Sequence, residues 1–328
     1  MTSRERFTRC LSFQEVDRVP VVEWATWWDQ TLARWYEEGL PRQLTGDSVN
    51  DYFQHDRLHQ FWLPVRDEGC PAPAYHGAPL ASTPAEYARL RKHLLTEELL
   101  DRAEAEIATY VRLHGEEEAA TWFTLEGFFW FPRTIFGIEG HLYAFYDQPE
   151  LMEEINRALC DYHKRLLARI YAYVTPQFMT FAEDMSYNHG PMLSRELYDR
   201  FMLPYYRELI PLIQAHGTRV MIDTDGFVEP LIPWFLDAGI EGVLPLERMA
   251  GVDVNRIRAQ YSRFLMLGGF DKTVMHRGEA AMRQEFERLL PAIRSGGYIP
   301  AVDHQTPPDV SLETYRVFLH LLWEYCQR

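Results

Sequence analysis

Acidic residues follow the apolar, strand-like segments of this chain. The clearest example is RVMIDTDGF (219–227), in which Asp223 and Asp225 come directly after a buried-strand pattern. Other strand-like segments end in the same way, at Glu23, Glu126, Glu183 with Asp184, Glu247, Asp271 with Lys272, and Asp303 with His304. Carboxylates gathered in one place repel one another, so they tend to bind a divalent metal, hold a cation or take up protons. The pattern therefore predicts metal, cation or acid–base chemistry.

The candidate residues divide by the chemistry that their side chains could supply. The expected ligands of a divalent metal, zinc or another ion, are Asp223, Asp225, Glu247 and His304. The expected acid–base residues are Glu183, Asp184, Lys272 and His304. The expected substrate-binding residues are Glu23, Trp24, Trp27, Trp28, Glu126, Tyr187, His189, Asp271 and Asp303. The tryptophans belong to this set because indole rings attract cations and stack on flat molecules.

Each of these residues also has a purely structural interpretation. Asp is a good helix N-cap, so a single acid such as Asp225 could simply cap the helix that follows it. Glu is a poor N-cap, and the glutamates at strand ends therefore need another reason. The three tryptophans could pack as a hydrophobic cap rather than bind a ligand. Histidines without a strand-end position are expected at the surface, namely His55, His59, His76, His93 and His141.

The segments that must position these residues alternate between two periodicities. Strand-like segments are 19–24, 121–126, 177–184, 219–223, 242–247, 264–271 and 297–304, and an eighth is expected near QFWLPV between residues 52 and 80. Helical segments are 149–173, 194–216, 228–238, 279–295 and 311–326. Such alternation is typical of βαβ units around a parallel sheet. Without a GxGxxG turn, it predicts an α/β fold with a single (β/α)8 TIM barrel over residues 1–328, and extra helices from 30–118 over the barrel mouth.

Composition and charge narrow the class of protein. The 328 residues carry a net charge of −15 with a pI near 5.3, so a nucleic-acid backbone would be repelled. The N-terminal MTSRERFTRCLSF lacks a signal-peptide pattern, and no apolar run is long enough to span a bilayer. We therefore expect a cytoplasmic protein without nucleic-acid or membrane partners. Cys10, Cys70, Cys160 and Cys326 are scattered, which predicts free thiols.

The chain resembles the uroporphyrinogen decarboxylase superfamily over most of its length outside about 30–118. The resemblance rests, in chain order, on SRERFTRCLSFQEVDRVPV, SYNHGPMLSRELYDRFMLPYYREL, MIDTDGFVEPLI, GVLPLERMAGVDV, LMLGGFDK and GGYIPAVDHQTPPDVS. This superfamily includes the haem-pathway decarboxylase and the cobalamin-dependent methyltransferases. The resemblance implies a single (β/α)8 barrel and an enzyme, without choosing between these activities.

The chain departs from the superfamily's patterns at two places that bear on the choice between a decarboxylase and a methyltransferase. The decarboxylase has an arginine-bearing RQAGRY-like segment after its first strand, whereas this chain has EWATWWDQ. The zinc methyltransferases carry His-x-Cys after the fifth strand and another Cys near the last, where this chain has Asp223-x-Asp225 and Asp303–His304. A mouth lined with acids would repel a substrate with many carboxylates, and oxygen ligands suit harder ions than thiolates do.

Three functions follow as hypotheses. The first is a methyltransferase that moves a methyl group between a small O- or N-methylated donor and a corrinoid carried by a partner protein. The second is a decarboxylase of a porphyrinogen or another carboxylic acid, which would need no cofactor. The third is a non-catalytic barrel that binds a cationic or flat ligand. All three predict a small-molecule ligand at the barrel mouth, and a homodimer is an open alternative to a monomer.

Overall fold

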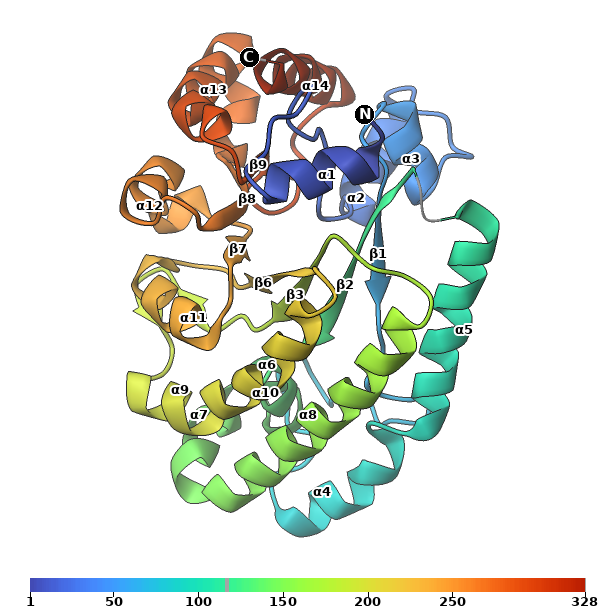
Figure 1. Cartoon of the computed structure of the whole chain (residues 1–328), viewed down its shortest axis with the longest axis vertical. Helices are drawn as coiled ribbons and strands as arrows, with labels where there is room; N and C mark the ends of the chain where they lie inside the picture. Colours follow the sequence, from blue (N-terminus) through green and yellow to red (C-terminus); the bar gives the residue numbers. More distant parts are fainter. Residues whose placement is uncertain (116–117, 328) are drawn as a thin grey trace.

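A parallel sheet of seven strands forms the centre of the fold. The computed structural model describes residues 1–115 and 118–327 (Figure 1). The strands are β1 (Leu58–Trp62), β2 (Ala120–Glu126), β3 (Phe178–Ala182), β6 (Arg219–Asp223), β7 (Gly242–Leu244), β8 (Leu265–Phe270) and β9 (Tyr298–Val302). They are ordered β1-β2-β3-β6-β7-β8-β9 in the sheet, and every neighbouring pair is parallel. The sheet curls as the wall of a TIM-type barrel, which confirms the predicted α/β fold class.

Helices that follow successive strands cover the outer face of the sheet (Figure 1). They are α5 (Glu97–His114), α8 (Pro149–Tyr171), α10 (Leu203–Gln214), α11 (Ile232–Ala238), α12 (Val254–Gln260), α13 (Glu279–Arg294) and α14 (Leu312–Cys326). The predicted helical segments are thus confirmed, although 194–216 divides into α9 (Arg195–Phe201) and α10. Pro204 stands in the first turn of α10. Because proline has no N–H to continue a helical ladder, the chain starts a new helix there.

Shorter elements fill the connections between these helices and strands. Before β1 lie α1 (Ser3–Leu11), α2 (Asp29–Glu37) and α3 (Asp47–Tyr52), and between β1 and α5 lie α4 (Pro84–Leu90) and η1 (Arg91–His93). Between β2 and α8 lie α6 (Trp130–Phe136) and α7 (Ile138–Asp147), and β3 is followed by the hairpin β4 (Ser186–Tyr187) and β5 (Gly190–Pro191). The 3-10 helices η2 (Glu229–Leu231), η3 (Arg248–Ala250) and η4 (Lys272–Arg277) follow β6, β7 and β8.

The prediction of a first strand at 19–24 is wrong. The Val19 N–H donates to the Cys326 carbonyl at the end of α14, and the Val21 carbonyl accepts from the Asp56 N–H just before β1, but no residue of 19–24 belongs to a ladder. Pro20 has no N–H to donate. The Val21 N–H donates to Asp56 Oδ2 at 2.8 Å. A side chain therefore occupies the position in which a neighbouring strand would pair. The strand expected near QFWLPV, in contrast, is confirmed as β1.

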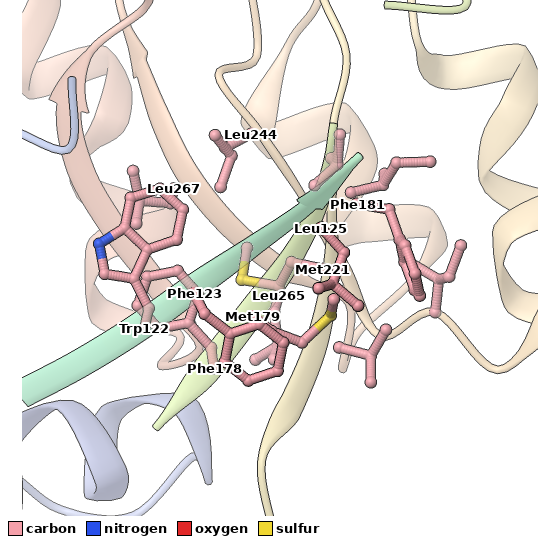
Figure 2. Packing of buried hydrophobic residues seen from close by; sticks show 14 of the residues in the cluster. Trp122, Phe123, Leu125, Phe178, Met179, Phe181, Met221, Leu244, Leu265 and Leu267 are labelled. Atoms are coloured by element: carbon pink, nitrogen blue, oxygen red, sulfur yellow. The ribbon is translucent and has the colours of Figure 1, made fainter. Parts of the chain in front are cut away.

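Aromatic packing closes the barrel at the amino ends of the strands. Phe7 of α1 stacks on Phe178 of β3 with ring centroids 6.3 Å apart, and Phe178 stacks on Trp122 of β2 at 4.9 Å. Figure 2 shows Trp122 and Phe178 in one cluster with Met179 and Leu265. Because this end is filled by rings, the polar residues of the barrel gather at the carboxyl ends of the strands, where the active sites of such barrels lie.

The helix α2 borders the carboxyl end of the barrel. In α2, Thr31 Oγ1 donates to the Thr306 carbonyl (3.0 Å) and Trp35 Nε1 to the Val310 carbonyl (2.9 Å), so this helix lies against the segment that follows β9. In residues 1–115 and 118–327, no helix has the length and apolar character that a membrane crossing needs.

Candidate active site at the carboxyl ends of the strands

Four carboxyl groups from three strand ends share one place. Asp184 follows β3, Asp223 and Asp225 end and follow β6, and Glu247 follows β7. The backbone joins the first two ends, because the Glu183 N–H donates to the Asp223 carbonyl (2.9 Å). The charges of Asp184 and Asp225 both act on Asp223, and those of Glu247 and Asp184 act on Asp225. The structure therefore brings together four of the acids that the sequence pattern singled out.

Burial and repulsion between charges make Asp184, Asp223 and Asp225 hard to ionise. Burial is the largest cause of a pKa of Asp223 well above its ordinary value, and the neighbouring Asp184 and Asp225 charges add to it. The same causes, with Glu247 first among the charges, raise the pKa of Asp225 to about 7. Burial also raises the pKa of Asp184, while the charge of Arg133 opposes the shift. At neutral pH the cluster therefore holds protons that it can give to a ligand.

His304 stands beside this cluster. Its Nε2 lies 3.7 Å from Asp225 Oδ2, and the exposed fractions of the two side chains are 33% and 38%. Burial, followed by the charge of Lys272, lowers the pKa of His304, so the ring is mainly neutral. The Trp24 ring meets it edge-on with centroids 6.2 Å apart. A neutral imidazole next to an acid with a pKa near 7 can pass a proton in either direction.

Lys272 and Asp303 form a neighbouring pair. Lys272 Nζ lies 3.6 Å from Asp303 Oδ1, and the Asp303 side chain is fully buried. Asp303 also accepts hydrogen bonds from the backbone N–H groups of Arg248 (2.9 Å) and Lys272 (3.3 Å). Burial, against the opposing charge of Lys272, raises the pKa of Asp303 to about 6. Asp303 thus holds together the loops that follow β7 and β8.

The backbone conformation explains why position 226, the last of the DTDG segment, is a glycine. Gly226 has a φ of +83°, a backbone conformation that residues other than glycine rarely adopt. A Cβ at this position would lie 2.6 Å from the Tyr187 backbone. The Gly226 N–H donates to Glu247 Oε2 at 2.9 Å. Tyr187 and His189 stand at the rim, where both are exposed and their ring centroids are 5.6 Å apart. The turn at Gly226 therefore sets Asp225 against the loop that follows β7.

Other candidate residues are held by structural partners. The buried Glu183 carboxylate accepts from the backbone N–H groups of Phe128 (2.8 Å), Phe129 (2.7 Å) and Trp130 (3.1 Å), and from the Tyr206 hydroxyl. This places it under the loop between β2 and α6 rather than among the clustered acids. The acid–base role expected of Glu183 stays a prediction, because its carboxylate faces this loop and not the clustered acids.

Two further strand-end acids also have local partners. Glu126 is paired with Arg66 through two hydrogen bonds of 3.0 and 3.2 Å. Asp271 caps η4, because its Oδ1 accepts from the Thr273 N–H at 2.9 Å. The structural interpretation that the sequence left open for single acids therefore describes Asp271 well.

The three tryptophans take different positions. Trp24 donates from Nε1 to the Val302 carbonyl (3.1 Å) and lies next to His304. Trp27 is 8% exposed and packs against Trp35 at 5.7 Å, whereas Trp28 is 44% exposed at the rim. The packing of Trp27 agrees with the hydrophobic interpretation, whereas ligand binding by the tryptophans stays a prediction.

Several residues around the site carry no signal in the sequence. His55 and His141, expected at the surface, are 7% and 0% exposed, so that prediction is wrong for both. The Tyr315 hydroxyl donates to Glu23 Oε1 (3.0 Å) and lies 3.3 Å from His55 Nε2. Arg133 stands beside Asp184, to whose carbonyl its Nη1 donates at 3.2 Å. No pattern marks these residues, because each comes from a helix or loop remote from the strand ends.

The donor atoms at the mouth do not define a metal site. Over the described ranges 1–115 and 118–327, no three His, Cys, Asp or Glu side chains are arranged so that they could hold a metal ion. The metal expected at Asp223, Asp225, Glu247 and His304 therefore stays a prediction.

Comparison with known families places the chain. The model of the family described as uroporphyrinogen decarboxylase (URO-D) matches residues 134–325, more than half of the sequence. The chain belongs to the uroporphyrinogen decarboxylase family. The matched region contains the clustered acids and His304, so the candidate site lies within the family's part of the chain.

Individual relatives are distant. The uroporphyrinogen decarboxylases of Pseudomonas savastanoi pv. phaseolicola and Pseudomonas fluorescens are each 28% identical over 189 residues, which is 55% of this chain and 50% of theirs. The chain thus spans about half the length of the curated relatives that it matches. A methyltransferase from Methanosarcina mazei shares the fold over 99% of both chains, with a TM-score of 0.68 and 14% identity. The uroporphyrinogen decarboxylase family and its barrel are therefore shown, whereas the reaction is not.

Proposed function

We propose that this protein transfers a methyl group from a small O- or N-methylated donor to a corrinoid carried by a partner protein. The observation that carries the proposal is the contact of His304 with Asp225 inside a cluster of protonatable carboxyls. A methyl ether needs a proton on its oxygen to leave as an alcohol, and a neutral methylamine needs one on its nitrogen to leave as an amine, whereas a quaternary ammonium ion already leaves as a neutral amine. A general acid with a pKa near neutrality supplies such a proton efficiently. The Methanosarcina methyltransferase of the same fold agrees with this choice.

Each residue of the candidate site has a defined role in the proposed reaction. Asp225 donates the proton to the departing oxygen of an ether or to the nitrogen of a neutral methylamine, and a quaternary ammonium ion could take it up only as the amine that remains after transfer. His304 returns a proton to Asp225 from solvent. Asp184 and Asp223 lie beside Asp225, and repulsion from the Asp184 charge helps to keep the pKa of Asp225 high enough for it to hold this proton. Lys272 and Asp303 position the loops that carry these groups. Bound at the mouth, the corrinoid supplies the methyl acceptor.

The rim offers surface that a flat macrocycle could use. Trp28 and Tyr187 are 44% and 47% exposed; Trp28 bonds to Gln305, next to His304, and Tyr187 lies against Gly226, next to Asp225. Exposed aromatic rings of this kind stack on planar ligands. A corrinoid carried by a partner protein would therefore meet aromatic contacts at this end of the barrel.

Decarboxylation is the second candidate. The family description and the position of Arg133 beside Asp184 favour it, because an arginine can hold a substrate carboxylate. The same acid, Asp225, could then protonate the carbanion left after loss of carbon dioxide. The excess of carboxyls over cations at the mouth disfavours a porphyrinogen with many carboxylates.

One assay separates the candidates. The purified chain is incubated with cob(I)alamin and a panel of O- and N-methylated donors, and methylcobalamin formation is followed by absorbance; in parallel, uroporphyrinogen is supplied and carbon dioxide release is measured. We expect methyl transfer that Asp225→Asn abolishes and that Glu37→Gln, a change at an exposed helix end, leaves intact. Carbon dioxide release alone would replace the proposal with the decarboxylase, and binding without either reaction would leave a binding barrel.

A further inference from the structure

A separate cavity lies between β1 and the segment that precedes it. Its volume is about 250 Å³. Glu23, Trp24 and Trp27 line it on one side, and Gln60 of β1 and Trp122 of β2 line it on the other. This is smaller than the pockets that hold drug-sized molecules, so it suits a compact ligand.

The walls of the cavity are aromatic and held in place. Trp27 packs against Trp35 at 5.7 Å and against Tyr315 at 5.8 Å between ring centroids. Trp122 is fixed by its stacking on Phe178. Indole faces carry negative electrostatic potential and attract cations, most strongly where water is excluded. A preformed set of such faces binds without the cost of ordering flexible side chains.

The cavity is lined by carboxyl groups. Glu23 lies at its edge, and Asp47 lines it from α3 in contact with His59 (Oδ2 to Nδ1, 3.4 Å). Among its lining residues, all within the described part of the chain, there is no lysine or arginine. An anionic ligand would therefore find no counter-ion here, whereas a cation would find a carboxylate and three indole rings.

We propose that this cavity binds a compact methylated ammonium ion, with the Glu23 carboxylate as its counter-ion and the rings of Trp24 and Trp27 around its methyl groups. Trp24 joins the cavity to the acid cluster, since its ring also meets His304 at 6.2 Å. The proposal that a cation binds here depends only on the cavity. The further role of this ligand as the methyl donor rests on the proposed function.

Binding of such a cation is coupled to a proton. Burial raises the pKa of Glu23 to about 8, so the free protein holds this carboxyl mainly protonated at neutral pH. Of its neighbours, burial raises the pKa of Tyr315 well above its ordinary value and lowers that of His55 to about 4. Asp47 and His59 also line the cavity, and their hydrogen bond lowers the pKa of Asp47. A cation that favours ionised Glu23 therefore expels its proton, and affinity rises with pH until about pH 8.

Calorimetric titration of the whole chain tests the proposal with a matched pair of probes. Choline and its neutral isostere 3,3-dimethylbutan-1-ol have the same shape and differ in charge. We expect choline to bind at least tenfold more tightly, with about one proton released at pH 7 as measured in buffers of different ionisation enthalpy. Equal binding of the two probes, or no binding of choline at about 10 mM, would overturn the proposal.

Two variants locate the binding. Glu23→Gln keeps an acceptor for the Tyr315 hydroxyl and removes the charge, so we expect choline affinity to fall about tenfold and proton release to disappear. Glu37→Gln removes an exposed carboxylate outside the cavity and should change neither. If Glu23→Gln binds choline as the natural chain does, the cation sits elsewhere and the proposal fails.

The outcome is independent of the transfer reaction. Choline binding that depends on Glu23, without methyl transfer to cob(I)alamin from any donor, would keep the cation site and reject the methyltransferase. Methyl transfer from O-methyl donors, without choline binding, would keep the methyltransferase and reject the cation site.

Discussion

His304 Nε2 lies 3.7 Å from Asp225 Oδ2, so the ends of β9 and β6 meet through their side chains. The two strands are separated in the sheet by β7 and β8, and the contact crosses the barrel mouth rather than following a ladder. Only a curled sheet allows it, because in a flat sheet strands three places apart lie far beyond side-chain reach. The contact ties the proposed chemistry to the barrel itself.

Asp225→Asn tests the chemical role of this contact. The amide keeps the size of the side chain but cannot donate the carboxyl proton, so we expect kcat for the transfer reaction to fall by about 10²–10⁴-fold with little change in KM. Steady-state kinetics over several donor concentrations measures both. Because a repelled carboxyl is removed, thermal stability should not decrease, and a fall in Tm would mean that the loss of activity reflects damage to the fold.

His304→Gln tests whether the two residues act as a unit. If His304 works only by exchanging a proton with Asp225, the double variant with Asp225→Asn should be no slower than Asp225→Asn alone. Independent, multiplicative losses would show that His304 contacts the donor directly. The same kinetic assay decides between these results.

Glu23 gives the stability of the protein a defined pH dependence. The pKa of Glu23 is about 8 in the folded chain and about 4.5 in the unfolded chain, so folding favours the protonated form of this carboxyl. The stability that it contributes is fully present below about pH 4.5 and is lost as the pH rises through about 8. We expect Tm to fall between about pH 4.5 and pH 8 in the natural chain, and to fall less in Glu23→Gln. Equal slopes in the two proteins would show that Glu23 is ionised throughout.

The sequence predicted what local patterns determine. Alternating strand-like and helical segments specify a parallel barrel, and the barrel topology then brings strand ends together whatever their sequence separation. The strand-end pattern alone was therefore enough to group Asp223, Asp225 and Glu247. The strand β1 could be located only roughly, because its alternation is short and mixed.

Features that depend on tertiary contacts were not predictable. Glu183 and Asp184 are adjacent, yet one serves a buried loop and the other joins the clustered acids, because Asp184 adopts a φ of +43° that redirects the chain. No pattern distinguishes Trp27, which is buried, from Trp28, which is exposed. The cavity at Glu23 is formed by side chains from separate elements, so it exists only once they are packed.

Gly226→Ala tests the turn that positions Asp225. A methyl group there would lie 2.6 Å from the Tyr187 backbone at a φ of +83°, so both a clash and backbone strain oppose it. We expect a loss of about 2–4 kcal/mol in the free energy of unfolding, measured by denaturant titration. Gly251→Ala is the matched control, because its φ is +91° but nothing lies within 4 Å of the added atom. It should lose only about 1 kcal/mol from strain, and equal losses would mean that the contact with Tyr187 yields easily.

A double-mutant cycle tests the link between Gly127 and Glu183. A Cβ at Gly127 would overlap the Glu183 carboxyl, which accepts from three backbone N–H groups of the next loop. Gly127→Ala should therefore cost about 2–4 kcal/mol in the natural chain. With Glu183→Ala the space is vacant, so the same change should cost less than about 1 kcal/mol, a coupling measurable by denaturant unfolding.

Gly140→Ala serves as the control for this cycle. Gly140 lies within α7, and the nearest atom to an added Cβ is 4.0 Å away, so alanine should stabilise the helix by about 0.5–1 kcal/mol in both backgrounds. Additive costs of Gly127→Ala and Glu183→Ala would show that the carboxyl does not occupy the place beside Gly127. In that case Glu183 would be free to turn toward the clustered acids, and the acid–base role expected of it from the sequence would regain its physical basis.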